Sequence, residues 1–62
     1  MTPNDIKNHY QTGYRFSKET GMSQSSLVNW FKWGYVPLVS QAKIEQITNG
    51  KLKAEWNHAK KQ

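Results

Sequence analysis

The chain has 62 residues, enough for one small domain, and nine Lys and Arg against four Asp and Glu give it a net charge of +5. The absence of cysteine excludes a disulfide framework and a thiolate metal site. No apolar run approaches the roughly 18 residues of a membrane span, and the first ten residues lack the apolar core of a signal peptide, so we expect a soluble, cytoplasmic protein. A small basic domain suits a polyanionic partner, although the same charge could serve solubility alone.

The first predicted helix covers residues 3–10. Thr2 precedes it in the N-cap position, and Asp5, three residues later, can complete a capping box. Ile6 and Tyr10 are four residues apart and therefore share one apolar face. We expect this helix to pack as scaffold for the segment that follows.

A second and a third helix are predicted next, joined by a tight turn. The second covers about residues 13–20 behind Thr12 as its cap, and the third covers about residues 24–33. Gly21 lies in the turn, where it can adopt the left-handed backbone conformation that ends helices at no steric cost. Ser23 is predicted to cap the third helix with its hydroxyl.

The third helix has two contrasting faces. Leu27, Trp30 and Phe31 recur at the spacing of one helical stripe, which predicts that all three are buried. The rest of the helix carries no acidic residue, whereas an ordinary solvent-exposed face would carry Glu–Lys pairs. A surface without acidic side chains is suited to contact with phosphate groups.

Residues 38–48 form the fourth predicted helix, after a loop that contains Pro37. A proline disfavours helical geometry in the residue before it, so Val36 belongs to the loop. Ile44 and Ile47 are three residues apart and are predicted to form the apolar face of this helix.

The segment after Leu52 is predicted as a fifth, short helix, with Leu52 and Trp56 four residues apart. This pair could either close the core or lie at a dimer contact, and the tail Lys60–Gln62 is predicted to fray. Because no alternating pattern of strand type occurs, the sequence predicts an all-α fold, a compact bundle of about five short helices in a single domain over residues 1–62.

Residues 13–33 match the pattern of a helix-turn-helix, in which two helices cross steeply through a short turn. Counted from Gly13, the apolar, small and glycine positions of the pattern are occupied by Phe16, Ser17, Gly21, Met22, Leu27 and Trp30. Thr20 departs from the pattern, since its position is usually apolar. The same motif also occurs in protein-interaction domains, so the pattern alone leaves the partner open.

From about residue 3 to residue 56, the chain resembles the short Cro-type phage repressors, in particular their all-helical branch. The resemblance is carried, in this order, by Asp5-Ile6, Lys18, Gly21, Ser23–Trp30, Val36-Pro37, Ile44-Glu45, Thr48–Gly50 and Leu52. It implies a lambda-repressor-like domain that represses transcription by occupying double-stranded operator DNA in the bacterial host cell. It also implies a homodimer, at least on DNA, and hence an operator with an inverted repeat.

In such proteins the first turn of the recognition helix, here about residues 24–33, enters the major groove. The resemblance therefore assigns base readout to Gln24, Ser25, Val28 and Asn29. The Gln24 amide can form two hydrogen bonds with one adenine, a pattern that singles out that base. Phosphate contacts are expected from Tyr14, Arg15, Lys18, Ser23 and Lys32, each of which could instead be merely a solvated side chain or, for Ser23, a cap.

The large side chains around the loop at residue 36 have two interpretations. Clustered exposed aromatic residues often mark an interface, and on this basis the candidate dimer contacts are Trp33, Tyr35, Val36, Pro37 and Leu38. Alternatively, these residues seal the core of a very small domain.

No catalytic or metal chemistry is predicted. His9 and His58 lack the carboxylate or cysteine neighbours of a metal site, and the sequence contains neither a glycine-rich phosphate loop nor a nucleophile–base pair. We therefore expect no enzyme activity, cofactor, metal or small-molecule ligand. Two alternatives to a specific repressor remain: a helix-turn-helix that binds a protein, as in an antitoxin or a polymerase-binding regulator, and non-specific architectural DNA binding.

Overall fold

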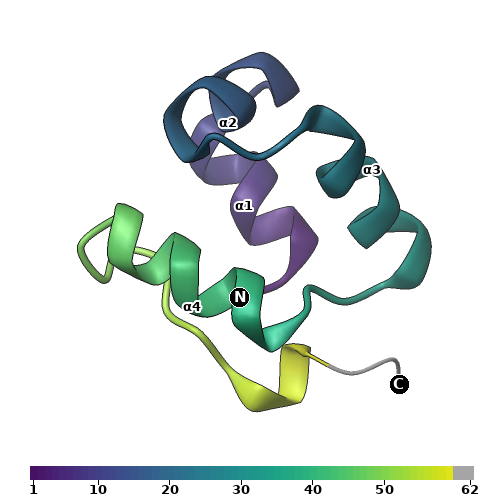
Figure 1. The fold of residues 1–62 in the computed structure, drawn as a ribbon. Coiled ribbons are helices and arrows are strands. Elements are labelled where there is room, and N and C mark those ends of the chain that lie inside the picture. Colours follow the sequence, from purple (N-terminus) through teal and green to yellow (C-terminus); the bar gives the residue numbers. More distant parts are fainter. Residues whose placement is uncertain (60–62) are drawn as a thin grey trace.

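The computed structural model describes residues 1–59 of the chain, apart from the side chain of His58. This part contains four α-helices: α1 (Pro3–Tyr10), α2 (Gly13–Thr20), α3 (Gln24–Trp33) and α4 (Leu38–Ile47) (Figure 1). The predicted fifth helix is wrong, because between Leu52 and residue 59 the chain forms only a 3₁₀ turn, η1 (Trp56–His58). The predicted fraying of Lys60–Gln62 lies outside the described residues.

The first three helices pack against one another, α1 against both α2 and α3, and α2 against α3. In Figure 1 they form the upper part of the molecule, and α4 crosses below them. The segment after α4 returns beneath this helix. The start of α3 lies next to the start of α2, while its last turn leads toward α4 (Figure 1).

The helix starts follow two of the three predicted caps. The Thr2 hydroxyl accepts from the Asp5 N–H at 3.1 Å, while the Asp5 carboxylate accepts from the Thr2 N–H at 2.8 Å, which confirms the capping box. The Thr12 hydroxyl accepts from the N–H of the third residue of α2 at 3.1 Å. The predicted capping by the Ser23 hydroxyl is wrong: this hydroxyl makes no capping bond, and the Ser26 N–H, from which it could have accepted, donates to the Ser23 carbonyl at 3.1 Å.

The corner between α2 and α3 has the predicted left-handed residue, Gly21, with φ of 76°. Its N–H donates to the Ser17 carbonyl at 2.9 Å and thereby closes α2. Thr20, the residue that departs from the motif, is buried, and its hydroxyl donates to the Phe16 carbonyl at 2.7 Å and accepts from the Met22 N–H at 3.1 Å. A threonine fits this apolar position because both hydrogen-bonding functions of its hydroxyl are satisfied locally.

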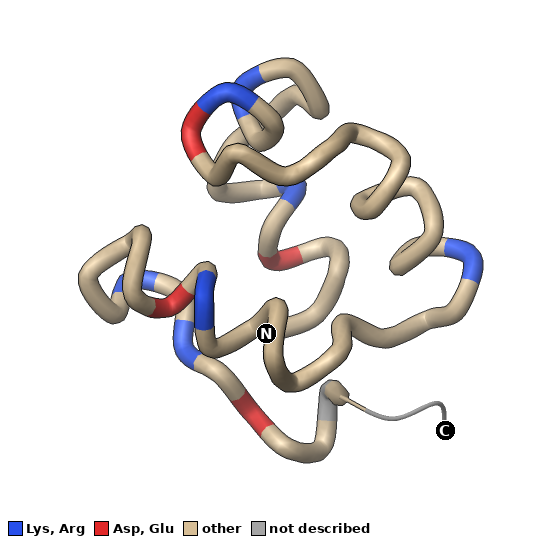
Figure 2. The backbone as a smooth tube through the Cα atoms, in the orientation of Figure 1, with Lys and Arg blue, Asp and Glu red and all other residues tan. Residues whose placement is uncertain are grey.

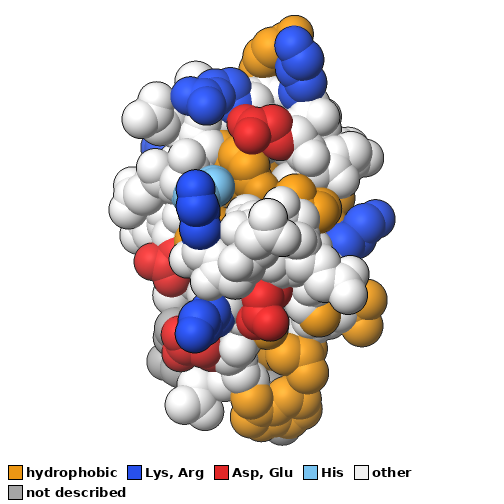
Figure 3. All heavy atoms as spheres, turned by 90° about the vertical axis from the view of Figure 1, so that its left-hand side faces the viewer, with side chains coloured by type: hydrophobic (Ala, Val, Ile, Leu, Met, Phe, Trp, Pro, Cys, Tyr) orange, Lys and Arg blue, Asp and Glu red, His pale blue; other side chains and the backbone are white. Residues whose placement is uncertain are grey.

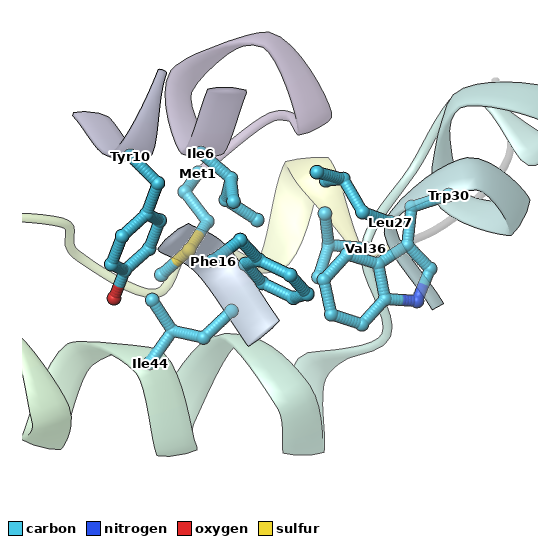
Figure 4. Packing of buried hydrophobic residues seen from close by; sticks show 8 residues of the cluster. All are labelled: Met1, Ile6, Tyr10, Phe16, Leu27, Trp30, Val36 and Ile44. Atoms are coloured by element: carbon cyan, nitrogen blue, oxygen red, sulfur yellow. The ribbon is translucent and has the colours of Figure 1, made fainter. Parts of the chain in front are cut away.

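Apolar side chains from all four helices, the N-terminus and the loop before α4 form one core (Figure 4). Phe16 lies at its centre, with edge-to-face contacts to Tyr10 and Trp30 at ring-centroid distances of 5.7 Å each. Such aromatic pairs stabilise beyond the burial of their area. The buried hydrophobic residues among those described are Met1, Ile6, Tyr10, Phe16, Leu27, Trp30, Val36 and Ile44.

Two predicted core residues are exposed. Phe31 is 42% exposed at the edge of the α3 stripe, with the Lys7 ammonium 5.9 Å from its ring centroid. Ile47 is 39% exposed, because the buried line along α4 runs through Gln41, Ile44 and Thr48 instead. Of the two predicted isoleucines only Ile44 is buried, and its buried neighbours Gln41 and Thr48 are polar residues whose side chains are hydrogen-bonded.

Gln41 joins segments that are far apart in the sequence, a role that was not predicted. Its side chain is fully buried, and its Oε1 accepts from the Met1 ammonium at 2.7 Å and from the Glu55 N–H at 2.9 Å. Its Nε2 donates to the Val36 carbonyl at 2.8 Å. The Met1 ammonium also donates to the Lys53 carbonyl at 2.9 Å. One amide therefore connects the N-terminus, the loop before α4 and the C-terminal segment.

A Tyr10→Phe variant should be as stable as the parent at pH 7, or more stable by up to about 1 kcal/mol. The buried Tyr10 hydroxyl has no hydrogen-bond partner within residues 1–59, and burial, with a smaller contribution from Glu19, raises the pKa of Tyr10. Above pH of about 10 the unfolded state ionises first, so stability of the parent should fall with rising pH, and the variant should lack this component.

Urea denaturation at pH 7 and at alkaline pH measures both effects. Tyr14→Phe, which removes an exposed hydroxyl, is the matched control. It should change neither the stability at pH 7 nor the loss of stability at alkaline pH. A loss of stability at pH 7 on removal of the Tyr10 hydroxyl alone would contradict the expected result.

Candidate nucleic-acid interface

The four predicted base-reading residues, Gln24, Ser25, Val28 and Asn29, are all exposed on α3. Val28 is 54% exposed although it is apolar. Since Leu27 and Trp30 anchor the opposite face in the core, the exposed face is held in a fixed orientation. The structure thus leaves these side chains available to a partner, and their contact with bases stays a prediction.

The start of α3 lies against the start of α2. A Cβ atom placed on Gly13 would be 3.1 Å from Oε1 of Gln24 and 3.6 Å from its Cδ. The Gln24 side chain therefore extends over the first residue of α2. Sequence analysis used Gly13 only to number the motif and did not predict this contact, because it depends on how the two helices cross.

The predicted phosphate contacts are also exposed, on α2 (Tyr14, Arg15 and Lys18), at the N-cap of α3 (Ser23) and in its last turn (Lys32). Arg15 and Lys18 lie on α2, where Arg15 Nε is 3.7 Å from a Glu19 carboxylate oxygen and Lys18 Nζ is 6.0 Å from the centroid of the exposed Tyr14 ring. Because the Arg15–Glu19 pair is half-exposed, it contributes little to stability and leaves the guanidinium free to exchange partners.

Charge is absent from most of α3 itself. Residues 24–31 contain no charged side chain, and Lys32 is the first one, in the last turn (Figure 2). Ser23, exposed at the other end, keeps a hydroxyl that is not used for capping. Basic or hydroxyl groups therefore border an uncharged helix surface.

The side of the molecule that is on the left in Figure 1 has a mixed charge. On the side shown in Figure 3, basic and acidic side chains alternate, and hydrophobic side chains gather at the lower end. Such alternation does not favour a polyanion, because each phosphate would meet acidic as well as basic groups.

The candidate dimer residues divide into two groups. The Trp33 and Tyr35 rings stack with centroids 5.7 Å apart and an angle of 27°, and Trp33 and Leu38 are exposed. Pro37 is half-buried. Val36 is fully buried in the core, so its side chain cannot be a dimer contact, which corrects that prediction.

Two further large hydrophobic residues are exposed outside the candidate dimer contacts. Val39 on α4, which sequence analysis did not single out, and Trp56 are both exposed, Trp56 by 57%. Of the two interpretations of Leu52 and Trp56, closure of the core holds only for Leu52, which packs against it. The exposure of Val39 could not be predicted from the sequence, because it depends on how α4 is oriented against the core.

Within residues 1–59 the structure contains no group of three or more His, Asp or Glu side chains that could hold a metal ion. No helix in this part of the chain is long and apolar enough to cross a membrane.

Comparison with known proteins identifies the fold. No protein-family model matches the chain, and no curated protein matches it. Among solved structures, it is similar to N15 Cro in complex with consensus operator DNA, with a TM-score of 0.84 and 24% sequence identity over 92% of this chain and 90% of that one. The predicted all-α, Cro-type fold is thereby confirmed: nearly the whole chain folds as N15 Cro does.

Proposed function

We propose that the protein is a sequence-specific, DNA-binding transcriptional repressor of the phage Cro type, acting as a single domain over residues 1–62 inside the bacterial host cell. The observation that carries this proposal is the exposed, acid-free surface of α3 on a fold shared with N15 Cro, whose structure holds operator DNA. A net charge of +5 supports attraction to DNA.

In this mode α3 enters the major groove. Gln24 reads an adenine through its amide, while Ser25, Val28 and Asn29 contact neighbouring base edges or methyl groups. The predicted phosphate contacts bind the DNA backbone and thereby fix the position of α3. These residues are Tyr14, Arg15, Lys18, Ser23 and Lys32.

A homodimer on DNA completes the proposal. The Trp33–Tyr35 stack and Leu38 offer a second copy an exposed apolar surface next to the end of α3. Two copies related by a twofold axis would place their recognition helices about 34 Å apart, one turn of DNA. The operator should then contain an inverted repeat.

Selection of bound sequences from random duplex DNA, at about 150 mM salt, tests this function. Enrichment of an inverted repeat would support a specific dimeric regulator. Retention of DNA without enrichment would instead favour architectural binding. A protein that retains no DNA would contradict the proposal and favour a protein partner for the exposed Trp33–Tyr35 surface.

Gln24→Ala and Lys32→Ala should weaken binding in different ways. Loss of the Gln24 amide should cost about 1–3 kcal/mol on the selected site and relax the preference at one base pair. Loss of the Lys32 ammonium should weaken all sequences alike and reduce the slope of log K against log salt by about one. Affinities of both variants, measured on the selected site and on its single-base variants over a range of salt concentrations, distinguish the two roles. Equal losses for Gln24→Ala on every sequence would contradict its readout role.

A further inference from the structure

We propose that Gly13 is a positioning residue for Gln24 and, through it, a determinant of DNA sequence preference. This inference rests on the proposed function. Gly13 is the first residue of α2 and lies beside the Gln24 side chain, three atoms of which would be within 3.6 Å of a Cβ at this position. Because Gly13 has no Cβ, the Gln24 side chain can lie in the position where that atom would otherwise crowd it.

Helix formation does not require glycine at this position. Gly13 has no positive φ, unlike Gly21 and Gly34, so an alanine could adopt the same backbone conformation. Alanine is also the better helix former and restricts the unfolded chain more. The feature that distinguishes glycine here is therefore the space above its Cα, which the amide end of Gln24 occupies.

The two helix starts are held firmly, so the side chain would have to move. Phe16 anchors α2 in the centre of the core, and the Thr12 cap closes its first turn. Leu27 anchors α3. A Cβ 3.1 Å from Oε1 of Gln24 is closer than ordinary van der Waals contact, and the flexible amide can give way more easily than the anchored backbone.

A displaced Gln24 amide should read DNA less well, because recognition of a base depends on the position and orientation of the amide. Bidentate recognition of adenine needs the oxygen and the nitrogen of one amide aimed together at two atoms of one base. Contact with α2 restricts the rotamers of a side chain that otherwise has much freedom to lose on binding. Reading groups held by neighbouring residues discriminate better than unsupported ones.

Affinities of Gly13→Ala, Gln24→Ala and the double variant test the inference, on the selected operator and on versions in which the base pair read by Gln24 is changed. Gly13→Ala should fold, keep the salt slope of the parent and lose discrimination at that base pair by about threefold or more. In the Gln24→Ala background the same substitution should have no further effect on discrimination, since the amide is gone. Gly13→Ser, which adds the same Cβ, should reproduce the change.

A measurement on the free protein covers the case in which a variant is unstable. Nuclear Overhauser effects between the Gly13 α-protons and the Gln24 γ-protons are expected in the parent chain, and their absence would overturn the inference. If Gln24→Ala loses discrimination at this base pair and Gly13→Ala keeps it, the inference is overturned and the proposed function stays intact. A parent chain that selects no DNA sequence would overturn both.

Discussion

A Phe16→Ala variant should lose a large part of its unfolding free energy at 25 °C. Phe16 is fully buried at the centre of the core and contacts the rings of Tyr10 and Trp30. Truncation of such a residue costs about 3–5 kcal/mol, through lost burial and the cavity that remains. Domains have roughly 0.05–0.15 kcal/mol of stability per residue, which is about 3–9 kcal/mol for 62 residues, so this cost is a large part of the total.

Far-ultraviolet circular dichroism with urea titration measures the effect. Phe31→Ala is the matched control, because the same atoms are removed from α3 at a half-exposed position, and it should cost under about 1.5 kcal/mol, including the lost contact with the Lys7 ammonium. Equal losses in the two variants would show that Phe31, too, belongs to the core.

A Gln41→Leu variant should lose on the order of 2–4 kcal/mol of unfolding free energy, although it replaces a polar residue in the core by an apolar one of similar size. The Gln41 side chain satisfies the Val36 carbonyl, the Glu55 N–H and the Met1 ammonium. Leucine would leave these groups without their buried partner, and each unsatisfied group costs about 1–3 kcal/mol if it stays buried.

Thermal unfolding of Gln41→Leu and of Gln46→Leu, an exposed position of the same helix, checks this expectation. The control should unfold at nearly the temperature of the parent. Stability of Gln41→Leu equal to that of the control would mean that the three polar groups find other partners, and the proposed structural role of Gln41 would be wrong.

The four helices could be predicted because their ends are specified locally. Thr2, Thr12 and Gly21 act on residues within one turn of themselves, so their effect is readable from spacing alone. The exposed face of α3 could be predicted for the same reason, since Leu27 and Trp30 define the opposite face.

Features that depend on how elements pack could not be predicted. A stripe of apolar residues shows the centre of a buried face but not its width, so Phe31 and Ile47 were placed inside when they lie at its edges. Gln41 looked like any surface glutamine, because its partners are provided by distant segments. The contact between Gly13 and Gln24 likewise exists only once α2 and α3 cross.

The uncharged stretch of α3 over residues 24–31 has an evolutionary consequence in the proposed mode of binding. Long-range attraction to DNA resides in side chains outside this stretch, whereas discrimination between sequences resides within it. Exchanges among neutral residues on the exposed face therefore leave the net charge of +5, and with it the rate of encounter with DNA, unchanged. A lineage of such proteins could acquire new target sequences through single substitutions while its solubility and general affinity for DNA stayed the same.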